Sequence, residues 1–418
     1  MSIGLRLFVS LLVIGIIAGL VGFALTELMH FVQHHAFAYA LNGENLPFRV
    51  GVEQAEPNRR WLVLTLCGLL VGFGWYAIQR WGAKLVGFKA AMAAPQQGMP
   101  FFTTVCHALL QIITVGLGSP LGRESAPREM SAAFASVWIK RAKLSDDDAA
   151  LLIACAAGAG LAAVYNVPLA ATVFILETLV VAINRRVIFA ALLTSLTATM
   201  VVRYTLGDLV QYHLSDSEVN HALLWFALSL GLLITPVVKL FRYTTALVPF
   251  LPRTDKRIIP LAILLFSLIG VVAIAFPDVL GNGKAGNQLA FAGLLNWHDG
   301  LALFAMKWLV VLLALAAGAY GGLITPSMML GSILAFSLAL GWNQFLPPIS
   351  LESAALIGAT AFLAISLKMP LTAIVFALEL SRTSAAMLLP LALAVCSAWA
   401  VEKWWFDSSK TNKAKTAL

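Results

Sequence analysis

The sequence predicts an all-α, polytopic membrane protein made of two inverted structural repeats with broken helices. Three observations support this prediction: long apolar runs without charge, an internal duplication, and glycine- and proline-rich breaks at corresponding places in the two copies. Of the 418 residues, 60% are hydrophobic and only 11% are charged, whereas about a quarter of a soluble domain is charged. A chain this poor in charge cannot cover a surface that faces water.

The apolar residues fall into runs that contain no Asp, Glu, Lys or Arg. Each run is near or above the roughly 20 residues that a helix needs to cross a bilayer. Soluble enzymes, nucleic-acid-binding proteins and secreted disulfide scaffolds are therefore excluded. The runs are residues 7–26, 61–79, 102–122, 149–176, 187–202, 222–238, 258–277 and 308–351.

The net charge of +8 is concentrated in short clusters between the apolar runs. This arrangement is typical of cytoplasmic loops that follow the positive-inside rule and touch anionic lipids. We therefore expect the lipid bilayer as a partner, no nucleic acid, and a multi-pass location in the cell inner membrane. The clusters are Arg59 and Arg60; Lys140, Arg141 and Lys143; Arg185 and Arg186; Arg253, Lys256 and Arg257; and Lys410, Lys413 and Lys415.

The polar connections are too short to form a separate soluble domain. We expect a single transmembrane transport domain over residues 1–403, with repeat halves at roughly 60–206 and 258–403, and a short basic cytoplasmic tail at 404–418. The four cysteines stand alone inside apolar runs and lack the paired spacing of a metal site. We accordingly expect no metal and no cofactor.

The duplication appears when the chain is aligned with itself at an offset of 202 residues. Residues 157–177 and 359–379 are then identical at eleven of 21 positions. Both copies contain Pro-Leu, at Pro168 and Pro370, and both end in glutamate, at Glu177 and Glu379. Duplicated halves with broken helices at matching positions are typical of transporters whose binding site lies between the halves.

Each half also contains a stretch that an ordinary spanning helix would not tolerate. An irregular backbone survives at membrane depth only where it is buried in protein or lines a polar cavity. We therefore expect half-helices to end at these two breaks. The first break holds Gly116, Gly118, Pro120 and Gly122, and the second holds Gly318, Gly321, Gly322 and Pro326.

The first break is followed by two charged residues, Arg123 and Glu124, and then by a predicted helix over residues 125–139. The N-terminus of a helix offers unpaired N–H groups and the positive end of a dipole, which together attract anions. A carboxylate at such a site competes with the anion while it is ionised and leaves when it is protonated. Glu124 is thus a candidate gate and proton carrier. The alternative is that Arg123 and Glu124 only reach the interface, with Glu124 paired to Arg128.

A second helix N-terminus follows the other break, at Leu323 and Ile324. If the two N-termini converge, their amides and the chain at Gly122 and Arg123 form an anion-binding cavity. Such a cavity suits a small ion that must also leave quickly.

Together these motifs resemble the CLC family of chloride channels and proton-coupled chloride antiporters. The resemblance implies a homodimer with one pore in each subunit, Glu124 as the external gate, and backbone amides of Leu323 and Ile324 as anion ligands. It also implies chloride, or a similar monovalent anion, and protons as substrates. The motifs are Gly122-Arg123-Glu124, the segment from Asn166 through Pro168-Leu169-Ala170 to Phe174 and Glu177, Gly281-Asn282-Gly283, and Gly321-Gly322-Leu323-Ile324-Thr325-Pro326.

Three positions depart from the family pattern. The serine of the upstream anion motif is replaced at Leu85, the pore tyrosine falls at Ser384 or Ala385, and the internal proton-handling glutamate is Thr178. Glu177 is then the nearest candidate for an inner proton donor, although a structural role is the alternative for both Glu177 and Glu379. We expect passive anion leak to exceed proton-coupled exchange. A proton-coupled antiporter for another halide, such as fluoride, is the alternative within the family.

A function of another class would be an intramembrane enzyme that uses Glu124 as a general acid or base. Such an enzyme needs a nucleophile, a second catalytic carboxylate or a set of metal ligands, and the sequence contains no His-Glu-x-x-His motif or similar constellation. We therefore expect a transport protein rather than an enzyme. A membrane scaffold without transport is disfavoured because broken helices at depth are costly unless they bind something.

Overall fold

The computed structural model describes residues 4–40, 46–180, 182–214, 219–248 and 251–407. Within these residues, nine helices are long and apolar enough to cross a membrane. The first part of the chain forms α1 (Leu5–Phe37), α2 (Phe48–Gln54), α3 (Pro57–Trp81), α4 (Phe88–Ala93), α5 (Phe101–Gly116), α6 (Ser125–Ala142), α7 (Asp146–Tyr165), α8 (Pro168–Phe174), η1 (Ile175–Leu179) and α9 (Arg185–Leu206). The second part forms α10 (His221–Leu247), α11 (Ile258–Ala275), η2 (Pro277–Val279), α12 (Lys284–Phe291), α13 (Trp297–Ala316), α14 (Ile324–Phe345), α15 (Leu351–Leu367), α16 (Pro370–Ser381), η3 (Ala385–Met387), α17 (Leu388–Val401) and η4 (Glu402–Asp407).

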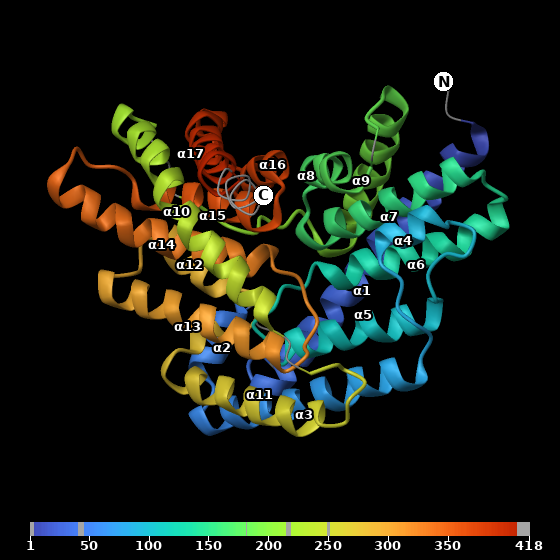
Figure 1. Ribbon diagram of the computed structural model, residues 1–418, viewed down its shortest axis with the longest axis horizontal. Coiled ribbons are helices and arrows are strands. Elements are labelled where there is room, and N and C mark those ends of the chain that lie inside the picture. The colour runs from blue at the N-terminus through green and yellow to red at the C-terminus, as the bar shows by residue number, and fades with distance from the viewer. Residues whose placement is uncertain (1–3, 41–45, 181, 215–218, 249–250, 408–418) are drawn as a thin grey trace, which may run out of the picture.

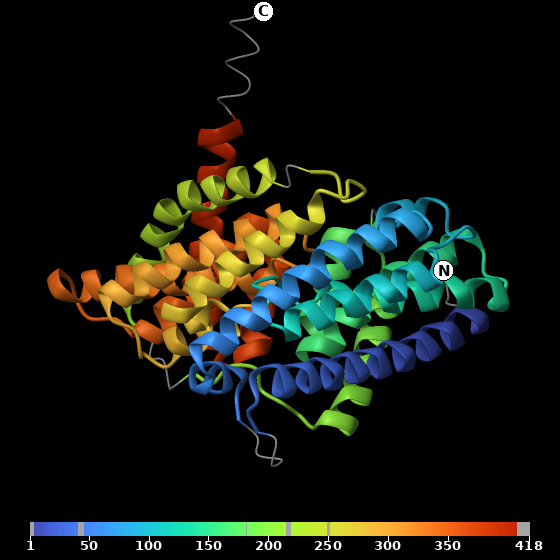
Figure 2. The same cartoon turned by 90° about the horizontal axis from the view of Figure 1, so that it is seen from below.

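The order of the helices confirms the duplication. The helices α3 to α9 have counterparts in the same order in α11 to α17. The counterparts α6 and α14 both begin near the middle of the molecule and extend in opposite directions (Figure 1), as an inverted repeat requires. Figure 2 shows the same two halves from below, with α1 lying along the first half.

Both predicted breaks are confirmed. α5 ends at Gly116 and α6 starts at Ser125, while α13 ends at Ala316 and α14 starts at Ile324. The second residue of each connection is a glycine with positive φ, Gly118 at 97° and Gly318 at 82°, a conformation that other residues adopt only at a cost. The apolar runs 102–122 and 308–351 therefore contain half-helices rather than continuous spans.

The run at residues 149–176 is also broken, which its apolar composition does not show. α7 ends at Tyr165, Asn166 has a φ of 62°, and α8 begins at Pro168. Proline lacks an N–H group and keeps the preceding residue out of the helical region, so the helix stops there. α15 and α16 repeat this break, with Lys368 at a φ of 56° before Pro370.

The two halves meet at their breaks. The N–H of Gly122 donates to the carbonyl of Gly322 at 2.7 Å, and the N–H of Gly322 donates back to Gly122 at 2.9 Å. This reciprocal pair fixes the start of α6 against the start of α14. Residues 200 positions apart in the chain, at corresponding places in the two halves, thus come together at the centre of the molecule.

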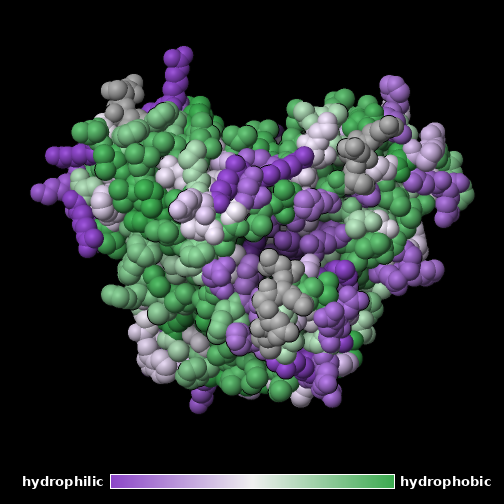
Figure 3. All heavy atoms as spheres, turned by 180° about the vertical axis from the view of Figure 1, so that it is seen from behind, coloured by the Kyte–Doolittle hydropathy of each residue, from purple (hydrophilic) through white to green (hydrophobic). Residues whose placement is uncertain are grey.

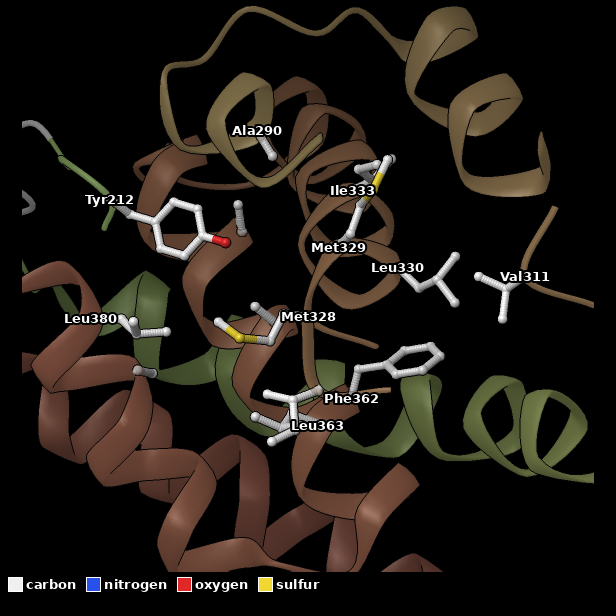
Figure 4. Close-up of a cluster of buried hydrophobic side chains, with 14 of the residues drawn as sticks. Tyr212, Ala290, Val311, Met328, Met329, Leu330, Ile333, Phe362, Leu363 and Leu380 are labelled. Atoms are coloured by element: carbon white, nitrogen blue, oxygen red, sulfur yellow. The ribbon is translucent and has the colours of Figure 1, made fainter. Parts of the chain in front are cut away.

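The start of α14 rests on a tightly packed core. Figure 4 shows Leu330 of α14 near Phe362 of α15 and Met329 of α14 beside Ile333, and all four are buried. A Cβ added at Gly331 of α14 would lie 2.2 Å from the carbonyl oxygen of Gly358 in α15. Glycine at both positions allows this close approach of two membrane helices, and the packing holds the N-terminus of α14 in place.

Large apolar side chains also cover much of the outer surface. Leu232, Leu233 and Trp225 of α10 are more than half exposed. In Figure 3, hydrophobic residues extend over much of the view, and hydrophilic residues gather near its centre and at its margins. Exposed apolar surface of this extent belongs in lipid, in agreement with a multi-pass membrane protein.

The positive-inside interpretation does not apply to Arg59 and Arg60. Arg59 donates to two carbonyls at the C-terminal end of α1, and Arg60 is buried and donates to the carbonyl of Ala273 in α11. The basic cluster at the end of α6 lies near the other end of α1, because Trp138 of α6 donates a hydrogen bond to Ser10 at the start of α1. The arginine pair therefore lies at the opposite end of α1 from that basic cluster and satisfies the ends of two helices.

Of the expected tail at residues 404–418, the first four residues continue η4. Its lysines at 410, 413 and 415 lie outside the described residues.

Candidate functional site

Glu124 lies at the first break, directly before α6, and its side chain is fully buried. Its Oε1 accepts a hydrogen bond of 2.8 Å from the N–H of Ile324, and its Oε2 accepts one of 2.9 Å from the hydroxyl of Tyr165. The carboxylate is therefore held by the N-terminus of α14 from the other half. The alternative, in which Glu124 reaches the interface and pairs with Arg128, is wrong.

Two glycines make room for this carboxylate. A Cβ on Gly122 would lie 2.2 Å from Oε2 of Glu124, and a Cβ on Gly322 would lie 1.7 Å from Oε1. Neither position can carry a side chain while the carboxylate stays in place. The glycines that pair the two breaks thus also form the walls of the site.

Two hydroxyl groups at the site were not predicted. Tyr165 is the last residue of α7, and its hydroxyl lies 2.6 Å from Oγ1 of Thr325, the second residue of α14. Because the tyrosine donates its single proton to Glu124, Thr325 donates to the tyrosine oxygen. The position of Tyr165 directly before the Asn166 break is the sequence signal that could have found it.

Ser384, where the resemblance implies the pore tyrosine, lies elsewhere. It is exposed and accepts a hydrogen bond from the N–H of Ala386, so it begins the short helix η3. The tyrosine at the site therefore comes from α7, and not from the segment near the end of the chain.

Arg123 is buried but lies beside the site rather than in its cavity. Its guanidinium donates to the carbonyl of Val164 at 3.3 Å and lies over the ring of Tyr165, 5.5 Å from the centroid. The side chain thus supports Tyr165. Gly122, Leu323 and Ile324 are brought together by the structure, as the sequence predicts.

Glu177 and Glu379 form a reciprocal pair of helix caps. The carboxylate of Glu177 accepts hydrogen bonds from the N–H groups of Leu371 and Thr372 at the start of α16, at 2.9 and 2.8 Å. The carboxylate of Glu379 accepts from the N–H groups at the start of α8, at 3.0 and 2.6 Å. Each glutamate thus caps the corresponding helix of the other half, in agreement with the structural alternative.

An open cavity of about 420 Å³ reaches Glu124 from one side. Among its described lining residues, Thr178 is present and Leu85 is not, and the only ionisable side chains are Glu124 and Arg128. Hence the gate candidate, the amides at the start of α14 and one cation share a water-accessible space. The lining residues are Glu124, Ser125, Arg128, Phe174, Thr178, Leu179, Gly321, Gly322, Leu323, Ile324, Leu367 and Met369.

Comparison with known proteins agrees with this arrangement. The H(+)/Cl(-) exchange transporter ClcA of Yersinia pestis bv. Antiqua (strain Angola) is 26% identical over 391 residues, which cover 88% of this chain and 79% of the relative. The crystal structure of a slow cyanobacterial Cl-/H+ antiporter has a TM-score of 0.82 at 22% identity and covers 96% of this chain and 95% of that chain. A CLC-type fluoride/proton antiporter has a TM-score of 0.70 at 19% identity and covers 95% of each chain. At these identities the two structures establish the shared fold.

The sequence profile of the voltage-gated chloride channel family matches residues 67–403, which include both breaks, both capping glutamates and the cavity. The chain therefore belongs to the voltage-gated chloride channel family, the CLC family.

Proposed function

We propose that the protein transports chloride and that the Glu124 carboxylate is the gate. One observation carries this proposal: the carboxylate accepts a hydrogen bond from the N–H of Ile324, an amide that is otherwise free to bind an anion. A carboxylate and a chloride ion carry the same charge and compete for the same donor. Chloride can occupy this position only when the side chain leaves it.

Protonation of Glu124 allows its side chain to leave the N–H of Ile324. The neutral carboxyl group accepts weaker hydrogen bonds than the carboxylate and no longer attracts the positive end of α14. Protonation thus favours opening, which links chloride movement to protons. The exchange activity in the name of the Yersinia relative supports this link.

The coupling of protons to chloride is expected to be incomplete. Thr178, which lines the cavity, cannot ionise, and the cavity contains no described acid other than Glu124. A proton from that side must therefore reach Glu124 through water. Since the same cavity is open to anions, chloride can move without a proton, and we expect passive leak to exceed coupled exchange.

Glu177 and Glu379 allow a matched test of the inner proton donor. Because both carboxylates cap a helix, Glu177→Ala and Glu379→Ala should each lower the free energy of unfolding by about 0.5–2 kcal/mol. If Glu177 only caps α16, the two variants keep the same ratio of protons to chloride. Thermal unfolding and paired flux measurements check this. A loss of proton movement confined to Glu177→Ala would instead establish it as the donor.

We propose that this transport protein works as a homodimer in the cell inner membrane, as the resemblance to the CLC family implies. All groups that hold Glu124 come from one chain, so each subunit of such a dimer contains a complete site. The carboxylate contacts an amide and a hydroxyl rather than a second carboxylate or a metal ligand set, which favours gating over acid–base catalysis.

Backbone amides and hydroxyls should select weakly among small anions, because they impose little geometry on the ion. In proteoliposomes of the purified protein, we expect chloride, bromide and nitrate fluxes to agree within about tenfold. The efflux of each of these anions from the proteoliposomes, measured with ion-selective electrodes, tests the function and the selectivity together. No flux of any anion would refute the transport proposal, and a strong preference for fluoride would identify a fluoride transporter.

A further inference from the structure

Arg128 is a cation inside the cavity that the gating scheme does not use. It lies one helical turn after Glu124 on α6 and lines the same cavity of about 420 Å³. Among the described lining residues it is the only basic one. An arginine so placed is costly at membrane depth and indicates a functional role.

Two aromatic rings hold the guanidinium. Its central carbon lies 5.1 Å from the ring centroid of Phe88 and 4.5 Å from that of Phe174. Contacts of this kind engage the flat faces of the group, while the N–H donors point outward in its plane. The rings therefore fix the position of the charge without using its hydrogen-bonding capacity.

The structure shows no ion pair or hydrogen bond for Arg128 among the described residues, and its Nε is buried without a partner. Both nearby acids are engaged elsewhere. Glu124 is bound to Ile324 and Tyr165, and Glu129 lies within hydrogen-bonding distance of a histidine and a glutamine of α5. Both acids attract the guanidinium electrostatically without forming an ion pair with it, so its N–H groups remain available to an anion in the cavity.

The contact with Phe88 shows which segment lies next to the Arg128 guanidinium. Phe88 ends the segment 84–88, where the resemblance expects the serine of the anion motif and where Leu85 stands instead. Lys84 of this segment and Lys140 of α6 line one surface cavity, so the segment lies at the basic end of α6. By the positive-inside rule this end faces the cytoplasm.

We propose that Arg128 binds the transported anion in the cavity, on the cytoplasmic side of Glu124. The ligand is a small monovalent anion, with chloride as the reference. Its negative charge pairs with the guanidinium while Glu124 still occupies the amide of Ile324. The inference rests on the proposed anion transport and adds a second binding position to it.

The test compares Arg128→Gln with Arg141→Gln, which removes an exposed arginine from the far end of the same helix. Chloride binding to each purified protein is measured by calorimetry in chloride-free detergent buffer. We expect Arg128→Gln to weaken binding at least tenfold, because a charge-assisted contact is lost. Arg141→Gln should bind chloride like the wild type, and Arg128→Lys, which keeps the charge, should retain part of the affinity.

Equal affinity of folded Arg128→Gln and the wild type would overturn the inference while leaving the transport proposal intact. Absence of chloride flux through the wild type would refute the transport proposal itself. If Arg128→Gln does not fold, crystals of the wild type in bromide decide the question. Anomalous bromide density beside the guanidinium supports the site, and density confined to other positions refutes it.

Discussion

The Glu124→Gln variant is expected to conduct chloride about 10- to 100-fold faster than the wild type at neutral pH. The substitution replaces a charged acceptor that holds the N–H of Ile324 and the hydroxyl of Tyr165. Hydrogen bonds to charged groups contribute roughly 1.5–3 kcal/mol each, and every 1.4 kcal/mol corresponds to about a tenfold change in an equilibrium. The neutral amide should therefore leave the site far more often.

The same variant should lose all proton movement linked to chloride. Gln cannot take up a proton, so the ratio of chloride flux at acidic pH to that at neutral pH should fall to about one. The measurement is chloride efflux from proteoliposomes over a pH series, with Glu129→Gln, in the following helix α6, as the matched control. If Glu124→Gln keeps the pH dependence of the wild type, Glu124 is a structural residue.

Gly322→Ala should open the gate without touching Glu124. The new methyl group would lie 1.7 Å from Oε1 and 2.1 Å from the carboxyl carbon of Glu124. These atoms are the end of a flexible side chain, so the carboxylate moves away and gives up the N–H of Ile324. We expect chloride flux at neutral pH to rise by about tenfold or more, since at least one charged hydrogen bond is lost.

The effect of Gly322→Ala must depend on the carboxylate. In a Glu124→Ala background the methyl group has nothing to displace, and the added substitution should change the flux little. Gly341→Ala, on α14, is the control because its Cβ meets only Trp297, at an ordinary contact distance of 3.4 Å. Equal increases in both backgrounds would show that the methyl group acts on the backbone rather than on the gate.

The fold could be predicted from the sequence because membrane insertion and duplication both leave local signals. Uncharged runs mark the spans, and the shared Pro168 and Pro370 fix the register of the two halves. The break between α7 and α8 does not follow from the absence of charge in the run 149–176; its local signals are Asn166 and Pro168, which end α7 and begin α8.

The site could be predicted only in part. Glu124, Gly122 and Ile324 lie at or next to the glycine-rich breaks, where a short segment of sequence predicts a helix N-terminus and therefore an anion site. Tyr165 and Thr325 join the site through contacts between distant helices, and of the two only Tyr165 has a local signal, its position directly before Asn166. The role of Glu177 was left open for the same reason, since the helix it caps lies almost 200 residues further along the chain.

The most direct test of the account is to impose an outward chloride gradient on proteoliposomes and record chloride efflux and internal pH together. For the wild type we predict chloride efflux accompanied by proton uptake against the proton gradient. The number of chloride ions moved per proton should exceed that of an exchanger without passive leak. Glu124→Gln should show the efflux without the pH change. Proton uptake that persists in Glu124→Gln would contradict the assignment of Glu124 as gate and proton carrier.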